Sequence, residues 1–171
     1  SLVSVPGITA ALLHIFNHAL AKGALFLALA CLGMSVARIR IDSISGIAQK
    51  MPWTMAAFVL AGLSLIGVPG TAGFISKWYL ISATFRLDGL GIFLVAVIVI
   101  SSLMAVVYIW RVVEAAYFRA PDPDSAATEA PLPLLLATWG AVLLNFYFGL
   151  MPGVPLQLAT RAAQLLQGQM P

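Results

Sequence analysis

The stretch PWTMAAFVLAGLSLIGVPGTAGFISKWYLISATF, residues 52–85, sets the fold expected of this chain. Two apolar segments flank a cluster rich in glycine and proline. Each segment holds about fourteen residues and would cover about 21 Å as an α-helix, whereas the hydrocarbon core of a bilayer is about 30 Å thick. Neither segment is therefore long enough to cross a membrane alone. We predict one discontinuous transmembrane helix over residues 53–86, broken near 67–73, and the residues expected to break it are Gly67, Pro69, Gly70 and Gly73.

The composition indicates that the bilayer is the solvent of this chain. Hydrophobic residues make up 61% of the chain, charged residues make up 9%, and the mean hydropathy is +1.01, whereas an ordinary soluble domain holds about 25% charged residues. The apolar runs are long and continuous, unlike the alternating segments of about ten residues in a membrane barrel. We therefore predict an all-α, polytopic transmembrane helical bundle.

The charge pattern and the cysteine content exclude several classes of site. The net charge is +3, but no basic stripe interleaves with aromatic residues, which argues against nucleic-acid binding. Cys31 is the only cysteine, so no intrachain disulfide and no CxxC ligand pair can form. We expect no metal, no cofactor and no catalytic chemistry within this chain itself, although it could serve as a subunit of a proton-translocating oxidoreductase.

Three further apolar stretches predict spans at residues 8–34, 90–118 and 132–150. Together with the broken helix they make residues 1–151 a transmembrane region. Residues 152–171 place glutamines and an arginine among apolar residues, which is typical of a short helix at the membrane interface. The domain organisation expected is therefore one membrane region followed by an interfacial tail.

The distribution of basic residues supports a single broken crossing at 53–86. Basic residues gather on the cytoplasmic side of membrane proteins. With one broken crossing, that side receives Arg38, Arg40, Lys50, Arg111 and Arg119, and the opposite side receives Arg86 and Arg161. Cysteines introduced at Ser43 and Ser125 would then be accessible from the same side of the membrane. We expect a multi-pass protein of the inner (plasma) membrane.

A polar stripe follows the first predicted span. His14, His18 and Lys22 are spaced four residues apart, and because each step of four rotates by only about 40°, the three side chains share one helix face over about 12 Å. The alternative is that the histidines bond to neighbouring helices and that the lysine reaches toward the interface. A lysine in the middle of the bilayer is disfavoured by about 3 kcal/mol. A lysine side chain can extend to the interface only from a position near the end of a helix. Because histidine gains and loses a proton near neutral pH, we interpret the stripe as a proton path.

Lys77 follows directly after the predicted break. Unpaired backbone groups at membrane depth are tolerated where they line a water-filled cavity. Lys77 is therefore predicted to be a second proton-holding site, which the stripe approaches through water; the alternative is an interfacial anchor beside Trp78 and Tyr79. Arg111 and Glu114 are three residues apart and are expected to form a structural ion pair.

The motifs HIFNHALAKGALFLALA at 14–30 and PWTMAAFVLAGLSLIGVPGTAGFISKWYLISA at 52–83 resemble the antiporter-like membrane subunits of Mrp-type cation/proton antiporters, respiratory complex I and membrane-bound hydrogenases. The residues around Lys77 are most similar to the D-type subunit of Mrp antiporters. The resemblance implies that the chain is the second half and C-terminus of such a subunit. It also implies that His14, His18 and Lys22 match the central hydrophilic axis and that Lys77 matches the lysine of the second broken helix.

The resemblance implies a proton- or cation-translocating subunit of a multisubunit Mrp-type antiporter, with other membrane subunits as partners and protons and sodium ions as candidate cargo. A close alternative is the same module in a complex I-like NADH:quinone oxidoreductase or a membrane-bound hydrogenase. A more distant alternative is a structural membrane subunit that transports nothing. The glutamate and lysine of the family's first half have no counterpart here. Since the chain opens on Ser1 just ahead of an apolar run, we expect it to be part of a longer protein.

Overall fold

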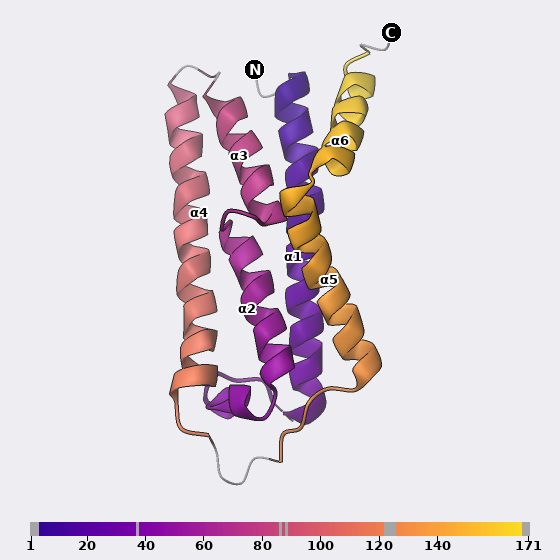
Figure 1. Ribbon diagram of the computed structural model, residues 1–171. Helices are drawn as coiled ribbons and strands as arrows, with labels where there is room; N and C mark the ends of the chain where they lie inside the picture. Colours follow the sequence, from indigo (N-terminus) through magenta and orange to yellow (C-terminus); the bar gives the residue numbers. More distant parts are fainter. Residues whose placement is uncertain (1–3, 37, 86, 88, 122–125, 169–171) are drawn as a thin grey trace.

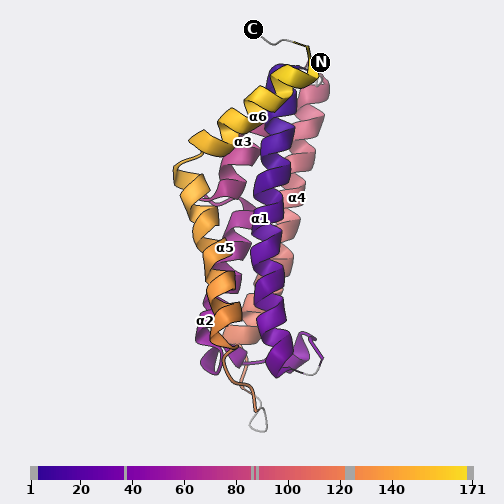
Figure 2. The same ribbon diagram turned by 90° about the vertical axis from the view of Figure 1, so that its right-hand side faces the viewer.

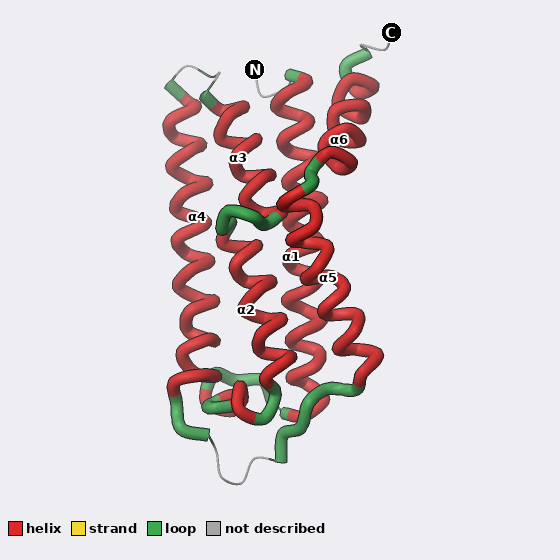
Figure 3. Tube along the Cα trace, viewed as in Figure 1, coloured by secondary structure: helices red, strands yellow, loops and turns green. Residues whose placement is uncertain are grey.

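A computed structural model describes residues 4–36, 38–85, 87, 89–121 and 126–168 of the chain. Throughout these ranges the regular elements are helices, and no strand occurs (Figure 3). The elements are α1 (Val5–Ser35), η1 (Asp42–Ile44), η2 (Ile47–Gln49), α2 (Pro52–Ile66), α3 (Ala72–Thr84), α4 (Leu90–Val113), the π-helical turn η3 (Glu114–Phe118), α5 (Leu132–Leu150) and α6 (Gly153–Leu166).

Helix α1 is the centre of the bundle. It contacts α2, α3, α5 and α6, while α4 lies on the far side of α2 and α3 (Figure 1). In the view turned by 90°, α6 crosses the end of the bundle at an angle to the other helices (Figure 2). Among the described residues, three helices are long and apolar enough to cross a membrane, namely Val5–Ser35, Leu90–Phe118 and Leu132–Leu150. The predicted fold class, an all-α transmembrane bundle, is confirmed.

Helices α2 and α3 follow one another along one line beside α1, with a short loop between them (Figures 1 and 3). Helix α2 ends at Gly67 with φ 94°, and Gly70 has φ 90°. Residues with a Cβ atom rarely adopt such left-handed angles, whereas glycine does so without steric cost. The Thr71 hydroxyl then accepts a hydrogen bond from the backbone N–H of Phe74 at 3.4 Å and starts α3. Local backbone chemistry therefore both ends α2 and begins α3.

The loop after α1 and the end of α4 meet at one end of the bundle. The Gly46 N–H donates to the Ala115 carbonyl at 2.9 Å, and Arg119 lies 3.8 Å from Asp42. The end of α3 and the start of α4 lie at the opposite end, with the start of α1 (Figure 1). Arg86 and Ser125 lie outside the described residues, so the assignment of membrane sides that uses them stays a prediction.

The ion pair predicted from the sequence joins Arg111 and Glu114, and the structure shows a different partner for Glu114. Both residues lie in the described part of the chain, but the Glu114 carboxylate lies 3.6 Å from Arg119 instead. The π-helical turn η3 begins at Glu114 and leads to Arg119. A π-helix closes its hydrogen bonds between residues five apart, so that Glu114 and Arg119 come to the same face.

Candidate functional site

One cavity of about 290 Å³ collects the ionisable residues that the sequence singled out. It lies between α1, α3 and α4, beside the end of α2. Each water molecule occupies about 30 Å³ in the liquid, so the cavity has room for several. The side chains that matter most to its chemistry are His14, His18, Lys22, Lys77, Ser101 and Tyr108.

Lys77 is bound to the end of the broken helix. Its Nζ donates to the Leu65 carbonyl at 2.9 Å and to the Ile66 carbonyl at 2.8 Å. In a continuous helix the Leu65 carbonyl would accept from residue 69, but that residue is Pro69, which has no N–H. The break therefore frees the carbonyl groups that the ammonium group uses.

A third acceptor for Lys77 comes from α4. The Ser102 hydroxyl oxygen lies 2.8 Å from Nζ, and this hydroxyl donates to the Ile98 carbonyl at 3.0 Å. An ammonium group carries three donors, and the three acceptors match them. This arrangement therefore suits an ammonium group, because each of its three N–H groups would have a partner.

His14 reaches α3 through a serine. Its Nδ1 lies 3.1 Å from the Ser76 hydroxyl oxygen, and the Ser76 hydroxyl donates to the Gly73 carbonyl at 3.2 Å. Serine has one proton to donate, so when that proton goes to the Gly73 carbonyl, the first bond takes its proton from Nδ1 of His14. The His18 ring follows, with its centroid 5.5 Å from that of His14.

Lys22 lies at the edge of the same cavity. Its side chain is exposed in this chain and also lines a neighbouring cavity between α1, α2 and α4. His14 and His18 are half-buried. Among the described residues no hydrogen bond joins Lys77 to any of these three side chains. The cavity itself is the space that separates them.

Buried polar groups fix the break between α1 and α5. The Asn17 side-chain amide donates to the Ala72 carbonyl at 2.7 Å. The Ser64 hydroxyl donates to Oδ1 of Asn145 at 2.8 Å and accepts from the Gly73 N–H at 3.3 Å. A Cβ atom on Gly73 would fall 1.8 Å from the Ser64 carbonyl oxygen, so this position needs glycine.

Sequence reasoning missed Ser76, Ser102, Ser64 and Asn145. A usable signal existed for Ser102, because Ser101 and Ser102 are the only polar side chains between residues 90 and 107. The serine that precedes Lys77 carried no signal of its own. In the part of the chain that the structure describes, no group of three or more His, Cys, Asp or Glu side chains is arranged to hold a metal ion.

Comparisons with known proteins agree with this architecture. NADH-quinone oxidoreductase subunit N from Desulforudis audaxviator is 46% identical over 123 residues, which are 72% of this chain and 24% of that protein. Na(+)/H(+) antiporter subunit A1 from Staphylococcus haemolyticus is 30% identical over 161 residues, covering 88% of this chain and 20% of that protein. The chain thus spans about a quarter or less of the length of these curated relatives.

Two solved structures contain a similar fold. The Mrp complex from Dietzia sp. DQ12-45-1b matches with a TM-score of 0.82 at 22% identity, covering 94% of this chain and 38% of that chain. The membrane-bound sulfane sulfur reductase, an archaeal respiratory membrane complex, matches with a TM-score of 0.74 at 36% identity, covering 84% of this chain and 24% of that chain.

A sequence profile described as "NADH:quinone oxidoreductase/Mrp antiporter, TM" matches residues 1–105, which is more than half of the chain. This range contains the polar stripe, the helix break and Lys77. The resemblance stated from the two motifs is confirmed, and the chain belongs to the NADH:quinone oxidoreductase/Mrp antiporter family of multi-pass membrane subunits.

Proposed function

We propose that this chain is a proton-translocating membrane subunit of a multisubunit complex. Lys22 and Lys77 hold protons, and His14 and His18 relay them. The observation that carries the proposal is that all four side chains line one cavity beside a helix break. A structural subunit without transport has no need for such a cluster, because ionisable groups at membrane depth are costly.

The geometry of Lys77 offers a means of gating. The charged amine is stabilised by carbonyl groups of α2 and by the Ser102 hydroxyl of α4. A small separation of α4 from the break would remove one acceptor and favour release of the proton. A proton arriving on Lys22 would act in the same direction, because two positive charges in a low-dielectric space repel strongly.

Two settings are open for this activity. The sequence motifs favour Mrp-type exchange of a monovalent cation for a proton. The 46% identity to a subunit of an NADH-quinone oxidoreductase is a specific observation in favour of a redox-driven complex. In both settings other membrane subunits are the partners, and electron transfer, where it occurs, belongs to them.

The test uses the intact complex in sealed vesicles. We expect Lys77→Ala and Lys22→Ala to abolish most proton movement, and Lys77→Arg to fail as well, because arginine holds its proton and cannot release it. His14→Ala should be milder, since water can bridge one missing relay. Arg40→Ala, an exposed loop change, is the matched control that removes a cation elsewhere.

Proton movement at the wild-type rate in Lys77→Ala would refute the proposal. The same vesicles separate the two settings. Proton movement driven by an imposed sodium gradient alone supports exchange. Proton movement that requires NADH and a quinone supports the redox-driven complex.

A further inference from the structure

Helix α6 separates two cavities of similar size and different chemistry. Pro155, Ala159 and Ala163 recur every four residues and are buried, so they mark the side of α6 that packs into the bundle. Helix α1 is the element that α6 contacts most extensively. One cavity lies on each flank of this packed side, and the two differ in the groups that line them.

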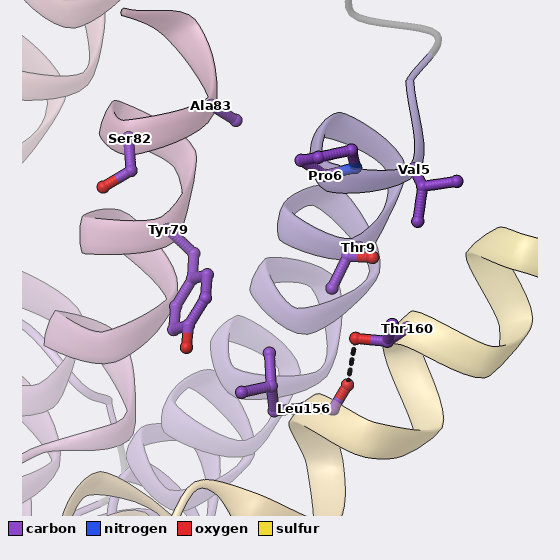
Figure 4. Close-up of a pocket in the computed structure, with 8 residues that line it drawn as sticks. All are labelled: Val5, Pro6, Thr9, Tyr79, Ser82, Ala83, Leu156 and Thr160. Atoms are coloured by element: carbon purple, nitrogen blue, oxygen red, sulfur yellow. Dashed lines mark hydrogen bonds between the residues drawn. The ribbon is translucent and has the colours of Figure 1, made fainter.

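The first cavity has a volume of about 360 Å³ and lies between α1, α3 and α6. Tyr79 of α3 and Thr160 of α6 bring hydroxyl groups to it (Figure 4). The Thr160 hydroxyl donates to the Leu156 carbonyl at 2.8 Å, so its proton is already used within α6. Among the described residues around this cavity none is charged. This flank of α6 therefore offers an ion no opposite charge.

The second, which we call the apolar cavity, has a volume of about 390 Å³ and lies between α1, α5 and α6. Each of the described residues that line it has a hydrocarbon side chain. They include Leu12, Phe16, Phe148, Val154 and Leu158. Val154 and Leu158 are 59% and 62% exposed, so the cavity is open on its outer side. Water finds no hydrogen-bond partner on such walls, and an apolar occupant is therefore favoured.

A polar strip runs along α6 beside the apolar cavity. Gln157, Arg161 and Gln164 are spaced four and three residues apart, so their side chains share one face of the helix. Arg161 also follows Leu158 by three residues, which places it next to the cavity wall. Arg161 is exposed, and in the described part of the chain no carboxylate pairs with it. A guanidinium group flanked by two amide donors suits an anion.

The charges of the surrounding helices also favour an anion. Helices α1, α5 and α6 contain neither Asp nor Glu, and Arg161 is the one charged residue of α5 and α6. A negative group beside Arg161 is therefore attracted to it and meets no negative charge on the three helices that form the apolar cavity. Basic residues near the membrane surface attract the headgroups of anionic lipids in this way.

The arginine and the cavity follow one another along α6. Helix α6 leads from the end of α5 toward the end of the bundle where α1 begins (Figures 1 and 2). Arg161 follows Val154 by seven residues and lies about 10.5 Å farther along the helix toward that end. Phe148, which precedes α6, contacts Phe16 of α1 edge to face with ring centroids 5.4 Å apart. A chain that starts beside Arg161 can run back along the cavity toward these two rings.

The size of the apolar cavity favours an acyl chain over a helix of another protein. An α-helix with its side chains is at least about 10 Å across, so one turn of about 5.4 Å takes up about 420 Å³. The cavity, at about 390 Å³, holds less than one such turn. An acyl chain is a single file of carbon atoms that can enter it and gain dispersion contacts with its walls.

We propose that the apolar cavity and the strip of Gln157, Arg161 and Gln164 form a binding site for one anionic phospholipid. Arg161 pairs with the phosphate, the two glutamines donate to oxygen atoms of the headgroup, and one acyl chain fills the cavity. The bound lipid joins α6 to α1 and α5. The site is separate from the proposed proton path, because the apolar cavity shares no lining residue with the cavity around Lys77.

Photocrosslinking in the intact complex tests this site. The complex is placed in nanodiscs of phosphatidylcholine with a trace of phosphatidylglycerol that carries a photoreactive group in one acyl chain, and labelled peptides are identified by mass spectrometry. We expect residues 148–162 to be labelled about fivefold more than by photoreactive phosphatidylcholine with the same chain, since one arginine near the membrane surface favours an anionic headgroup by about this factor. Arg161→Gln should remove the preference, whereas Arg40→Gln, an exposed change in the loop after α1, should retain it.

Two results would overturn the proposal. Equal labelling by the two lipids, unchanged in Arg161→Gln, would mean that the cavity holds ordinary membrane lipid without selection of the headgroup. Labelling elsewhere on the complex but not at residues 148–162 would mean that another subunit covers this face of α6.

A second variant tests the acyl-chain part of the site alone. Ala162→Phe places a ring in the apolar cavity and leaves Arg161 intact, so labelling of residues 148–158 by photoreactive phosphatidylglycerol should fall at least about fivefold, because close packing leaves no room for ring and chain together. Leu165→Phe, on the outer side of α6 but outside the cavity, is the matched control and should keep the labelling. Unchanged labelling in Ala162→Phe would show that the chain does not enter the cavity.

The same labelling in a Lys77→Ala background separates this site from the proposed function. We expect the preference for phosphatidylglycerol to persist there while proton movement is lost. Loss of the preference in Lys77→Ala would overturn the separation of the lipid site from the proton path, and full proton movement with an intact preference would refute the proposed function alone.

Discussion

Helix α4 and the neighbouring pair α2 and α3 differ in how their backbone hydrogen bonds are satisfied. Helix α4 continues without interruption, its most apolar stretch has a mean hydropathy of 2.9, and only 11% of that stretch is buried within the chain. The pair α2 and α3 covers a similar length beside it but is interrupted halfway (Figure 1). A continuous helix satisfies its own backbone, whereas a broken one needs partners from outside.

The partners of the broken pair come from two neighbouring helices and from a side chain of the pair itself. Asn17 of α1 bonds to the start of α3, Asn145 of α5 bonds to Ser64 of α2, and Lys77 bonds to the last carbonyl groups of α2. The chemistry of the site is therefore attached to the region that depends most on its neighbours. The comparison predicts that substitutions at the break are costly and that similar substitutions in self-sufficient helices are not.

The largest effect is expected for Gly73→Ala. The added Cβ would lie 1.8 Å from the Ser64 carbonyl oxygen, and since backbone cannot yield as a side chain can, we expect a loss above about 3 kcal/mol or failure to fold. The matched control is Gly23→Ala in α1, where the Cβ meets nothing within 4 Å. Stability against denaturing detergent measures both. Equal stability of the two variants would mean that the break is looser than its contacts indicate.

A smaller loss is expected for Gly149→Ala in α5. Its Cβ would lie 2.3 Å from the Gly70 carbonyl oxygen, so α5 must move away from the break, at a cost of about 2–3 kcal/mol. Gly140→Ala on the same helix meets nothing within 4 Å and should change stability by less than about 1 kcal/mol. The two thermal denaturation curves provide the measurement, and coincident curves would contradict the tight approach of α5.

Ser102→Ala removes the hydrogen bond between Lys77 and α4. Loss of a hydrogen bond to a charged group costs about 1.5 kcal/mol or more, so proton movement in vesicles should fall roughly tenfold. Ile100→Ala, an exposed position two residues earlier on α4, should leave the rate unchanged. Similar rates for the two variants would show that the hydrogen bond from Lys77 to Ser102 does not contribute to proton movement.

The smallest effect is a coupling between Ser64 and Asn145. A double-mutant cycle with Ser64→Ala and Asn145→Ala should give an interaction free energy of about 1 kcal/mol, the net value of one buried hydrogen bond. Unfolding in denaturing detergent supplies the four stabilities. Strictly additive losses would show that α5 braces the break through packing alone.

Long-range contacts also organise the end of the bundle where the loop between α1 and α2 lies. The Glu129 carboxylate accepts hydrogen bonds from the Trp53 N–H at 3.0 Å, from the Thr54 N–H at 3.2 Å and from the Thr54 hydroxyl. The first N–H groups of a helix have no partner within it, and Met51, the residue before α2, supplies no side-chain cap. The cap therefore comes from a segment more than seventy residues away in the chain.

Features that depend on local chemistry could be predicted from the order of residues alone. Glycine and proline at 67–73 set the position of the break because φ angles and missing N–H groups belong to the residues themselves. The spacing of His14, His18 and Lys22 placed them on one face of α1, since α1 keeps the α-helical repeat through these residues. The same reasoning did not foresee the contact of Glu114 with Arg119, because that contact spans a π-helical turn.

The bonding partner of each polar group, in contrast, depended on how the helices pack. The acceptors of Lys77 lie eleven, twelve and twenty-five residues away in the chain, and Asn145 meets Ser64 across eighty-one. Helix propensity and hydrophobic period contain no information about such pairs, because these depend on which helix faces meet and how closely the backbones approach. Buried polar groups in a membrane must nevertheless be satisfied, and the packing of α1, α4 and α5 around the break selected the partners.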